Sequence, residues 1–190
     1  MSWNAASLVI SVCWVFLVVC FAVASARARV IRRSGKTGLR RDNRSLLGLI
    51  LQGFGIAFAV NISNPVHVNE WWRIGLASLL APLGAAVGAA GPLQLGRHLR
   101  GQAIVTDDHE LVKSGPYAIV RHPLYAGTMW LTVATGLVRT TWSQLILGLV
   151  IYCVGTEIRV RVEEALLLRR FPEAMLNYQR RVKAYIPFVR

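Results

Sequence analysis

The sequence predicts an all-α integral membrane protein: a helical bundle of about five transmembrane helices with one more helix at a cytosolic C-terminus. Three observations support this fold class. Hydrophobic residues make up 54% of the 190 residues, a larger share than a soluble globular domain normally has. Several apolar runs have about the length that crosses a bilayer. The basic residues behind the net charge of +13 cluster at the ends of these runs, as the positive-inside rule describes.

The N-terminal part, residues 1–100, is expected to contain three spans, over residues 8–26, 46–62 and 74–95. Residues 27–44 hold eight Lys or Arg against one Asp, which predicts a cytosolic loop and an N-terminus on the outer side. No basic residue precedes the first apolar run. We therefore interpret that run as a retained anchor rather than a signal peptide.

The third span is rich in glycine and alanine. Small residues let helix backbones approach closely in lipid, where burial of apolar surface gives no drive to associate. Pro82 and Pro92 are expected to kink this helix. Trp71 and Trp72 precede it, where an aromatic belt at the membrane surface would lie.

The C-terminal part, residues 101–190, is predicted to hold a ligand-binding motif region, a helical hairpin and a tail, and the whole chain to form a single domain. The apolar runs 125–138 and 142–154 are short, so we expect them to pair as a hairpin with a tight turn. The second of them should continue into a charged helical section. Residues 165–183 alternate apolar and basic residues at helical spacing, which predicts an amphipathic cytosolic helix lying along the membrane.

The basic segments 27–44 and 97–121 and the tail all fall on the same predicted side. The motif region is therefore expected to face the cytosol, in a bacterial or archaeal inner membrane rather than the endoplasmic reticulum. Nucleic acid is not a predicted partner, because the basic residues follow the ends of apolar segments instead of forming a separate patch.

Residues 109–127, with the sequence HELVKSGPYAIVRHPLYAG, are the most informative stretch. They are polar and marked by glycine and proline, yet they lie between segments apolar enough for lipid. Gly115-Pro116 and His122-Pro123 impose a non-helical backbone. Irregular backbone at a membrane boundary is tolerated only where protein buries it or where it lines a cavity. The stretch therefore predicts a preformed ligand pocket facing the membrane.

Two interpretations of the charged residues around this stretch remain open. Arg121 and His122 could be a basic interfacial anchor before a helix-starting proline, or Pro123 could begin a helix whose free N–H groups point at a carboxylate-bearing ligand. Glu163 and Glu164 could be solvated charges paired with neighbouring arginines. Alternatively, one of them could bind an ammonium group or ribose hydroxyls.

Other kinds of chemistry are not supported by the sequence. His98, His109 and His122 lack HxxxH spacing and have no nearby cysteine, so no metal site is predicted. Ser114 lies in no GxSxG elbow, and no GxGxxG or phosphate loop occurs. The cysteines lie singly inside apolar runs, as buried structural thiols do; they are Cys13, Cys20 and Cys153.

The motifs resemble the isoprenylcysteine carboxyl methyltransferase family, within the wider phospholipid methyltransferase-like group. The resemblance extends from Gln102 to the C-terminus. It rests on residues 109–117, residues 121–127, the Glu163-Glu164 pair, Phe171, Tyr178, Arg181-Val182 and Pro187-Phe188. The chain departs from the family pattern at Pro172, where glycine is common, and at Met175, where tyrosine is usual. Both departures concern the tail more than the cofactor.

This resemblance implies a multispanning enzyme that uses S-adenosylmethionine to methylate a lipophilic acceptor, most simply a carboxylate such as that of an isoprenylcysteine-like compound. It assigns Arg159 as the catalytic residue that faces the acceptor. It assigns eleven residues to the cofactor pocket, namely Gln102, His109, Glu110, Leu111, Val112, Tyr117, His122, Pro123, Leu124, Tyr125 and Glu163.

Several rival functions remain. The acceptor could instead be a phospholipid amine or a small-molecule thiol. A membrane sterol-type reductase that uses NADPH has a similar C-terminal layout, although the Arg-His-Pro sequence with a downstream glutamate pair favours the methyl donor. A non-enzymatic membrane scaffold is the remaining alternative. It predicts that no cofactor binds and that changes at His122 and Glu163 affect stability alone.

Overall fold

A computed structural model describes residues 2–32, 40–41, 43–60, 70–96, 104–105 and 111–186. Within these ranges the chain is almost entirely helical. The helices are α1 (Trp3–Arg32), α2 (Arg44–Val60), α3 (Trp71–Leu95), α4 (Pro123–Arg139), α5 (Trp142–Arg170) and α6 (Pro172–Arg181). A short 3-10 helix, η2 (Gly115–Ala118), precedes α4, and the two-residue strands β1 (Arg40–Arg41) and β2 (Ile104–Val105) pair antiparallel.

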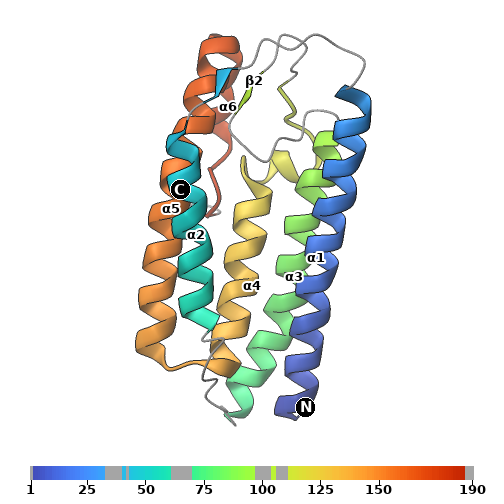
Figure 1. Cartoon of the computed structure of the whole chain (residues 1–190), viewed down its shortest axis with the longest axis vertical. Coiled ribbons are helices and arrows are strands. Elements are labelled where there is room, and N and C mark those ends of the chain that lie inside the picture. Colours follow the sequence, from blue (N-terminus) through green and yellow to red (C-terminus); the bar gives the residue numbers. More distant parts are fainter. Residues whose placement is uncertain are drawn as a thin grey trace.

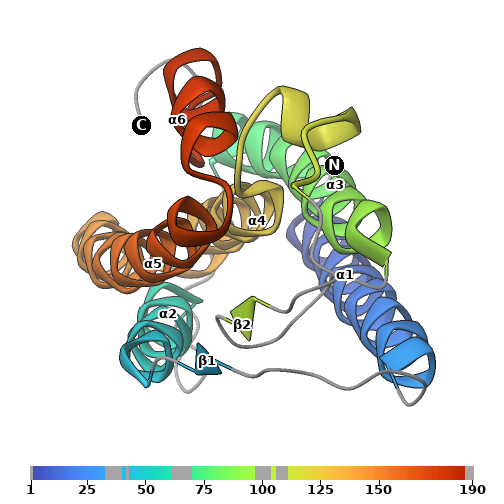
Figure 2. The same cartoon turned by 90° about the horizontal axis from the view of Figure 1, so that it is seen from above.

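Helices α1 to α5 lie side by side and run in alternating directions, as Figure 1 shows. The N-terminus lies at one end of the bundle, while η2, the β1–β2 pair and α6 lie at the other end (Figures 1 and 2). The expected all-α membrane bundle with a C-terminal helical hairpin is thus confirmed. Two helices, α1 over Trp3–Ala28 and α3, are long and apolar enough to cross a membrane.

Local sequence explains where the hairpin helices begin. Pro123 is the first residue of α4, a position where the missing N–H costs nothing because no partner exists for it there. Thr141 caps α5 in a capping box: its hydroxyl accepts from the backbone N–H of Gln144, and the Gln144 side chain accepts from the Thr141 N–H. These two starts fix the tight turn between α4 and α5.

A separate C-terminal helix is present, but the expected bounds of 165–183 are wrong. The fifth helix continues to Arg170, the chain breaks at Phe171, and a separate helix begins at Pro172. Proline at this position has no N–H and clashes with a continuing helix, but it suits a first turn. Met175 and Tyr178 are buried in the protein, so these two side chains of α6 pack on the rest of the molecule.

Small residues bring the helices into close contact, as the glycine-rich third span predicted. A Cβ atom added to Gly127 of α4 would lie 2.3 Å from the backbone nitrogen of Gly88 in α3. In the same way, a Cβ atom on Gly148 of α5 would lie 2.5 Å from the Ala59 side chain in α2. The backbones themselves form these contacts, which is how helices associate in lipid.

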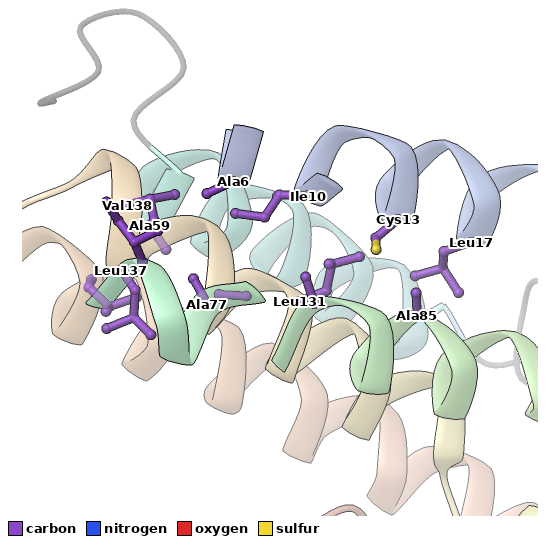
Figure 3. Packing of buried hydrophobic residues seen from close by; sticks show 14 of the residues in the cluster. Ala6, Ile10, Cys13, Leu17, Ala59, Ala77, Ala85, Leu131, Leu137 and Val138 are labelled. Atoms are coloured by element: carbon purple, nitrogen blue, oxygen red, sulfur yellow. The ribbon is translucent and has the colours of Figure 1, made fainter. Parts of the chain in front are cut away.

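An apolar cluster joins α1 to α3 and α4. It includes Ala6, Ile10, Cys13, Leu17, Ala77, Ala85 and Leu131 (Figure 3). Two indoles add hydrogen bonds: Nε1 of Trp3 donates to the Val138 carbonyl, and Nε1 of Trp14 donates to the Thr135 hydroxyl, each at 2.9 Å. The first apolar run is therefore a packed part of the bundle.

The end of the bundle opposite η2 is closed around Arg73, which we call the Arg73 anchor. The guanidinium donates to the Leu137 carbonyl at 2.7 Å and to the Thr140 carbonyl at 2.9 Å. It also lies 4.7 Å from the ring centre of Trp142, which stacks on Trp72. Arg73 thereby binds the last carbonyls of α4, where the helix dipole favours a cation.

Candidate active site

The charged residues singled out in the sequence converge at the end of the bundle that carries η2 and α6. Figure 2 looks down on this end of the bundle. His122 is the N-cap residue of α4, and Tyr125 lies in the first turn of that helix. Glu163 and Glu164 lie in the charged section of α5. The N-terminus of one hairpin helix and the C-terminal section of the other therefore supply this cluster.

His122 lies between the two carboxylates. Its Nδ1 is 3.4 Å from Oε2 of Glu163, and its Nε2 is 3.2 Å from Oε1 of Glu164. The ring also stacks on Tyr125, with 5.5 Å between ring centres and 8° between planes. Burial disfavours the charged imidazole, but hydrogen bonds and charges from both glutamates outweigh it, so the pKa of His122 is raised. Only the imidazolium can donate to both carboxylates at once.

Glu163 is the more open of the two glutamates. Its Oε1 accepts from the Tyr125 hydroxyl at 2.5 Å and from Nη2 of Arg159 at 3.1 Å. Its side chain is 22% exposed, compared with 9% for Glu164. A carboxylate has about four lone-pair sites, so Glu163 combines a fixed position with remaining acceptor capacity.

Arg159 is buried, with 5% of the residue exposed. Its Nε donates to the Tyr125 hydroxyl at 2.7 Å, and its Nη1 donates to the Ser45 carbonyl at 3.3 Å. The interpretation of Glu163 as a solvated charge paired with a neighbouring arginine is therefore wrong, since its arginine partner is buried. A buried arginine that bonds to three different groups is held in one orientation.

Glu164 faces the other side of His122. Its Oε1 accepts from Nε of Arg121 at 2.7 Å, and its Oε2 accepts from the Gln179 side chain at 2.7 Å. Arg121 also donates to the carbonyls of Val182 and Gln179. Arg121 is therefore a buried structural cation and not an interfacial anchor.

The remaining residues of the predicted cofactor pocket are placed as follows. The hydroxyl of Tyr117 donates to the Gly91 carbonyl at 3.3 Å. Pro123 is buried, and a Cβ atom on Gly91 would lie 2.7 Å from its ring. Leu111, Val112 and Leu124 are half-buried. Gln102, His109 and Glu110 lie outside the described residues.

Sequence reasoning missed several residues that complete the cluster. Tyr152 donates its hydroxyl to the Tyr125 carbonyl at 2.8 Å, Ser45 accepts from Arg159, and Gln179 holds Glu164. None of these three residues lies in a recognisable motif. Arg121, which was also left out of the predicted site, does lie in one, the Arg-His-Pro sequence, and that position was a usable signal.

Comparison with known proteins bears directly on this site. The model of the isoprenylcysteine carboxyl methyltransferase (ICMT) family matches residues 76–169. Over these residues the chain is similar to the isoprenylcysteine carboxyl methyltransferase family. His122, Tyr125, Arg159, Glu163 and Glu164 all lie inside the matched ICMT region, whereas Gln179 and the tail lie beyond it.

Individual relatives agree with the ICMT match. The chain is 33% identical over 116 residues to a protein-S-isoprenylcysteine O-methyltransferase of Schizosaccharomyces pombe. This alignment covers 53% of this chain and 49% of the relative. It is 27% identical to the cobalt-zinc-cadmium resistance protein CzcN of Cupriavidus metallidurans, over 61% of this chain and 51% of the relative. The chain thus spans about half the length of these curated relatives.

The fold is shared with a solved ICMT structure, that of the eukaryotic intramembrane Ras methyltransferase. The two align with a TM-score of 0.51 at 21% sequence identity, over 77% of this chain and 51% of the other. The likeness confirms the membrane helical fold.

Proposed function

We propose that this chain is an integral membrane methyltransferase that uses S-adenosylmethionine, on the cytosolic side of the membrane, to methylate a lipophilic acceptor. The acceptor we favour is a carboxylate such as that of an isoprenylcysteine-like compound. The main support is the buried network of His122, Tyr125, Arg159 and Glu163 at one end of the bundle, inside the ICMT region.

The residues present fit this methyl donor. The donor brings an ammonium group and ribose hydroxyls, which need an acceptor, and the partly exposed Glu163 carboxylate is such a group. The Tyr125 hydroxyl, Nη2 of Arg159 and the His122 imidazole hold that carboxylate in place. We assign the cofactor pocket to these residues together with the others that the family resemblance indicates, including Gln102, His109 and Glu110.

The proposed chemistry needs alignment more than it needs a strong acid or base. When bound, S-adenosylmethionine supplies a methyl group that is already activated on sulfur. A carboxylate acceptor is ionised at pH 7 and is already nucleophilic. The protein then has to hold both reactants in line and exclude water. The role we assign to Arg159 is orientation of the acceptor, since a tightly bound carboxylate would lose nucleophilicity.

A labelled-methyl transfer assay on the purified protein tests the proposal. The acceptor panel runs from farnesylcysteine analogues to phosphatidylethanolamine and small thiols. Acceptors without a prenyl group are included because the chain is also similar to a metal-resistance protein. A base-labile methyl product indicates a carboxyl ester, which we expect, and a base-stable product indicates N-methylation. Selective thermal stabilisation by NADPH instead of S-adenosylmethionine would favour the reductase and overturn the proposal.

The Arg159→Lys variant tests the role of that residue separately. Lysine is a point charge and cannot reproduce the planar fork that reaches Tyr125, Ser45 and Glu163. We expect turnover to fall by about tenfold or more. Affinity for S-adenosylmethionine should stay close to that of the parent, because the Tyr125 hydroxyl and the His122 imidazole still hold Glu163. Unchanged turnover would remove Arg159 from the site.

Reporter fusions to the C-terminus test the proposed sidedness, since a C-terminus on the outer side would contradict it.

A further inference from the structure

The segment after α6 is bound to the short stretch that holds His122. The backbone N–H groups of Arg121 and His122 donate to the carbonyls of Lys183 and Ala184, each at 2.8 Å. We call residues 182–186 the tail segment. It runs parallel to the chain just before α4, so residues distant in sequence support the N-cap of that helix.

Glu164 provides a side-chain link between the same parts. Its Oε1 lies 2.7 Å from Nε of Arg121 and 3.2 Å from Nε2 of His122, and its Oε2 lies 2.7 Å from the Gln179 amide nitrogen. Both oxygens of this carboxylate are thus engaged by protein groups. Its neighbour Glu163 has the larger exposed fraction, so the two adjacent glutamates have different roles.

We propose that Glu164 is a positioning residue that joins α6 and the tail segment, through Gln179 and Arg121, to the imidazole of His122. Docking of the tail segment then sets the orientation of His122. The inference rests on the proposed function in one respect, the place of His122 in the cofactor pocket. The connection from the tail segment through Glu164 to His122 rests on the contacts above. It also extends the site beyond the matched family region, because Gln179 lies outside that region.

The physical reason is that an imidazole held at one nitrogen can still turn, whereas one held at both nitrogens is fixed. The charged and titratable groups that face His122 are Glu163 and Glu164 from α5 and Tyr125 from α4, and α6 reaches it through the neutral Gln179. A ring fixed before ligand binding loses less entropy when the ligand arrives. Glu164 therefore acts on ligand affinity without contacting the ligand.

The test uses the full chain in detergent and two variants, Glu164→Gln and Gln179→Leu. Nitrogen-15 NMR follows the titration of His122, assigned by the loss of its signals in His122→Asn, and calorimetry measures S-adenosylmethionine affinity. For Glu164→Gln we expect a lower titration midpoint for His122 and affinity about tenfold weaker. KM for the donor should rise more than kcat falls. Gln179→Leu should also lower the titration midpoint of His122, weaken S-adenosylmethionine affinity and raise KM for the donor, each by less than Glu164→Gln does.

Two matched controls separate this link from general damage. Glu157→Gln removes a carboxylate from the same helix, where it pairs with the exposed Arg161, and Asn177→Leu changes an exposed position on α6. Neither control should alter the His122 titration or the affinity for S-adenosylmethionine.

A parent-like His122 titration in Glu164→Gln would overturn the proposal. A second outcome would also overturn the proposal. Glu164→Gln would lose S-adenosylmethionine binding, while its His122 titration and the Gln179→Leu variant stayed like the parent. Glu164 would then contact S-adenosylmethionine directly. If Glu164→Gln does not fold, Gln179→Leu decides by the same readouts. If the parent protein binds no S-adenosylmethionine, the proposed function fails, whereas the His122 titration still tests the link.

Discussion

The two ends of the bundle each bury an arginine, but they surround it differently. At the Arg73 anchor, the guanidinium bonds to the main-chain carbonyls of Leu137 and Thr140 and lies over Trp142. At the candidate active site, the Arg159 guanidinium bonds mainly to side chains, the Tyr125 hydroxyl and the Glu163 carboxylate. Both arginines are almost fully buried.

This difference separates a fold-forming charge from the one that we propose to be functional. Main-chain carbonyls at a helix C-terminus cannot leave their positions, so a ligand cannot replace the two close partners of Arg73. The Glu70 carboxylate lies farther from the guanidinium, at 3.9 Å, and its side chain is 54% exposed. The carboxylate beside Arg159 is shared among several donors and partly exposed, so a ligand can take up its remaining acceptor capacity. A buried arginine alone therefore does not mark a site, whereas an arginine beside a partly exposed carboxylate with acceptor capacity left for a ligand is a candidate for one.

The largest effect should come from breaking the Arg73 anchor. Arg73→Met keeps an apolar side chain of similar length but leaves two carbonyls without their partner and removes the contact with Trp142. We expect a loss of about 2–4 kcal/mol in unfolding free energy, measured by unfolding in mixed micelles. Affinity for S-adenosylmethionine in the folded protein should stay unchanged.

Arg161→Met is the control for this change, because the Arg161 side chain is 75% exposed. It should cost less than about 1 kcal/mol. An Arg73→Met protein as stable as the parent would show that the anchor does not hold the hairpin turn.

The second effect concerns a motif residue that we assign to packing. Gly127 closes the Arg-His-Pro motif, yet a Cβ atom there would lie 2.3 Å from the Gly88 nitrogen and 2.4 Å from the Gly84 carbonyl. Gly127→Ala should therefore force α3 and α4 apart and cost about 1–3 kcal/mol. Gly53→Ala is the control, since nothing lies within 4 Å of its added Cβ. It should be neutral or slightly stabilising.

The third effect is on binding. Glu163→Gln keeps the shape of the side chain but removes the charge that Tyr125, Arg159 and His122 surround. S-adenosylmethionine affinity should fall by about tenfold, equivalent to about 1.4 kcal/mol. Calorimetry measures the change, with Glu157→Gln as the control. Affinity equal to the parent's would contradict the assignment of Glu163 as the ligand-facing carboxylate.

Much of this arrangement could be predicted from the sequence. Hydrophobic run lengths and the distribution of arginines were sufficient for the all-α bundle and the alternation of helices, whereas the grouping of the motif region with Glu163 came from the family resemblance. The glycine-rich third span predicted close packing against a neighbour. These features are local or periodic, and local or periodic signals can be read from one chain.

The missed break at Phe171 had a local signal in Pro172, but the prediction followed the helical spacing of apolar residues on both sides of it. The other missed features depend on tertiary contacts. The sequence left open whether Glu163 and Glu164 are solvated charges, because it could not say whether another element covers their helix face. The Gln179 contact with Glu164 joins residues fifteen apart on two helices, and no local pattern indicates such a pair.

The smallest effect should be on the pH dependence of stability, and His122 is its source. The pKa of His122 is raised above its ordinary value of about 6.5 by the two glutamates that face it, despite burial. The protonated ring therefore contributes stability that is fully present below the unfolded-state pKa and is lost as pH rises through the folded-state pKa. We expect the apparent melting temperature to fall as pH rises through that window.

In His122→Asn this part of the pH dependence should disappear, because no ring titrates beside Glu163 and Glu164. The Arg73 anchor contains no group that titrates near neutral pH, so Arg73→Met should lower the melting temperature by the same amount at every pH in the window. A parent protein whose stability rises with pH there, or a His122→Asn variant that keeps the full decline, would show that His122 is not held as an imidazolium between the two glutamates.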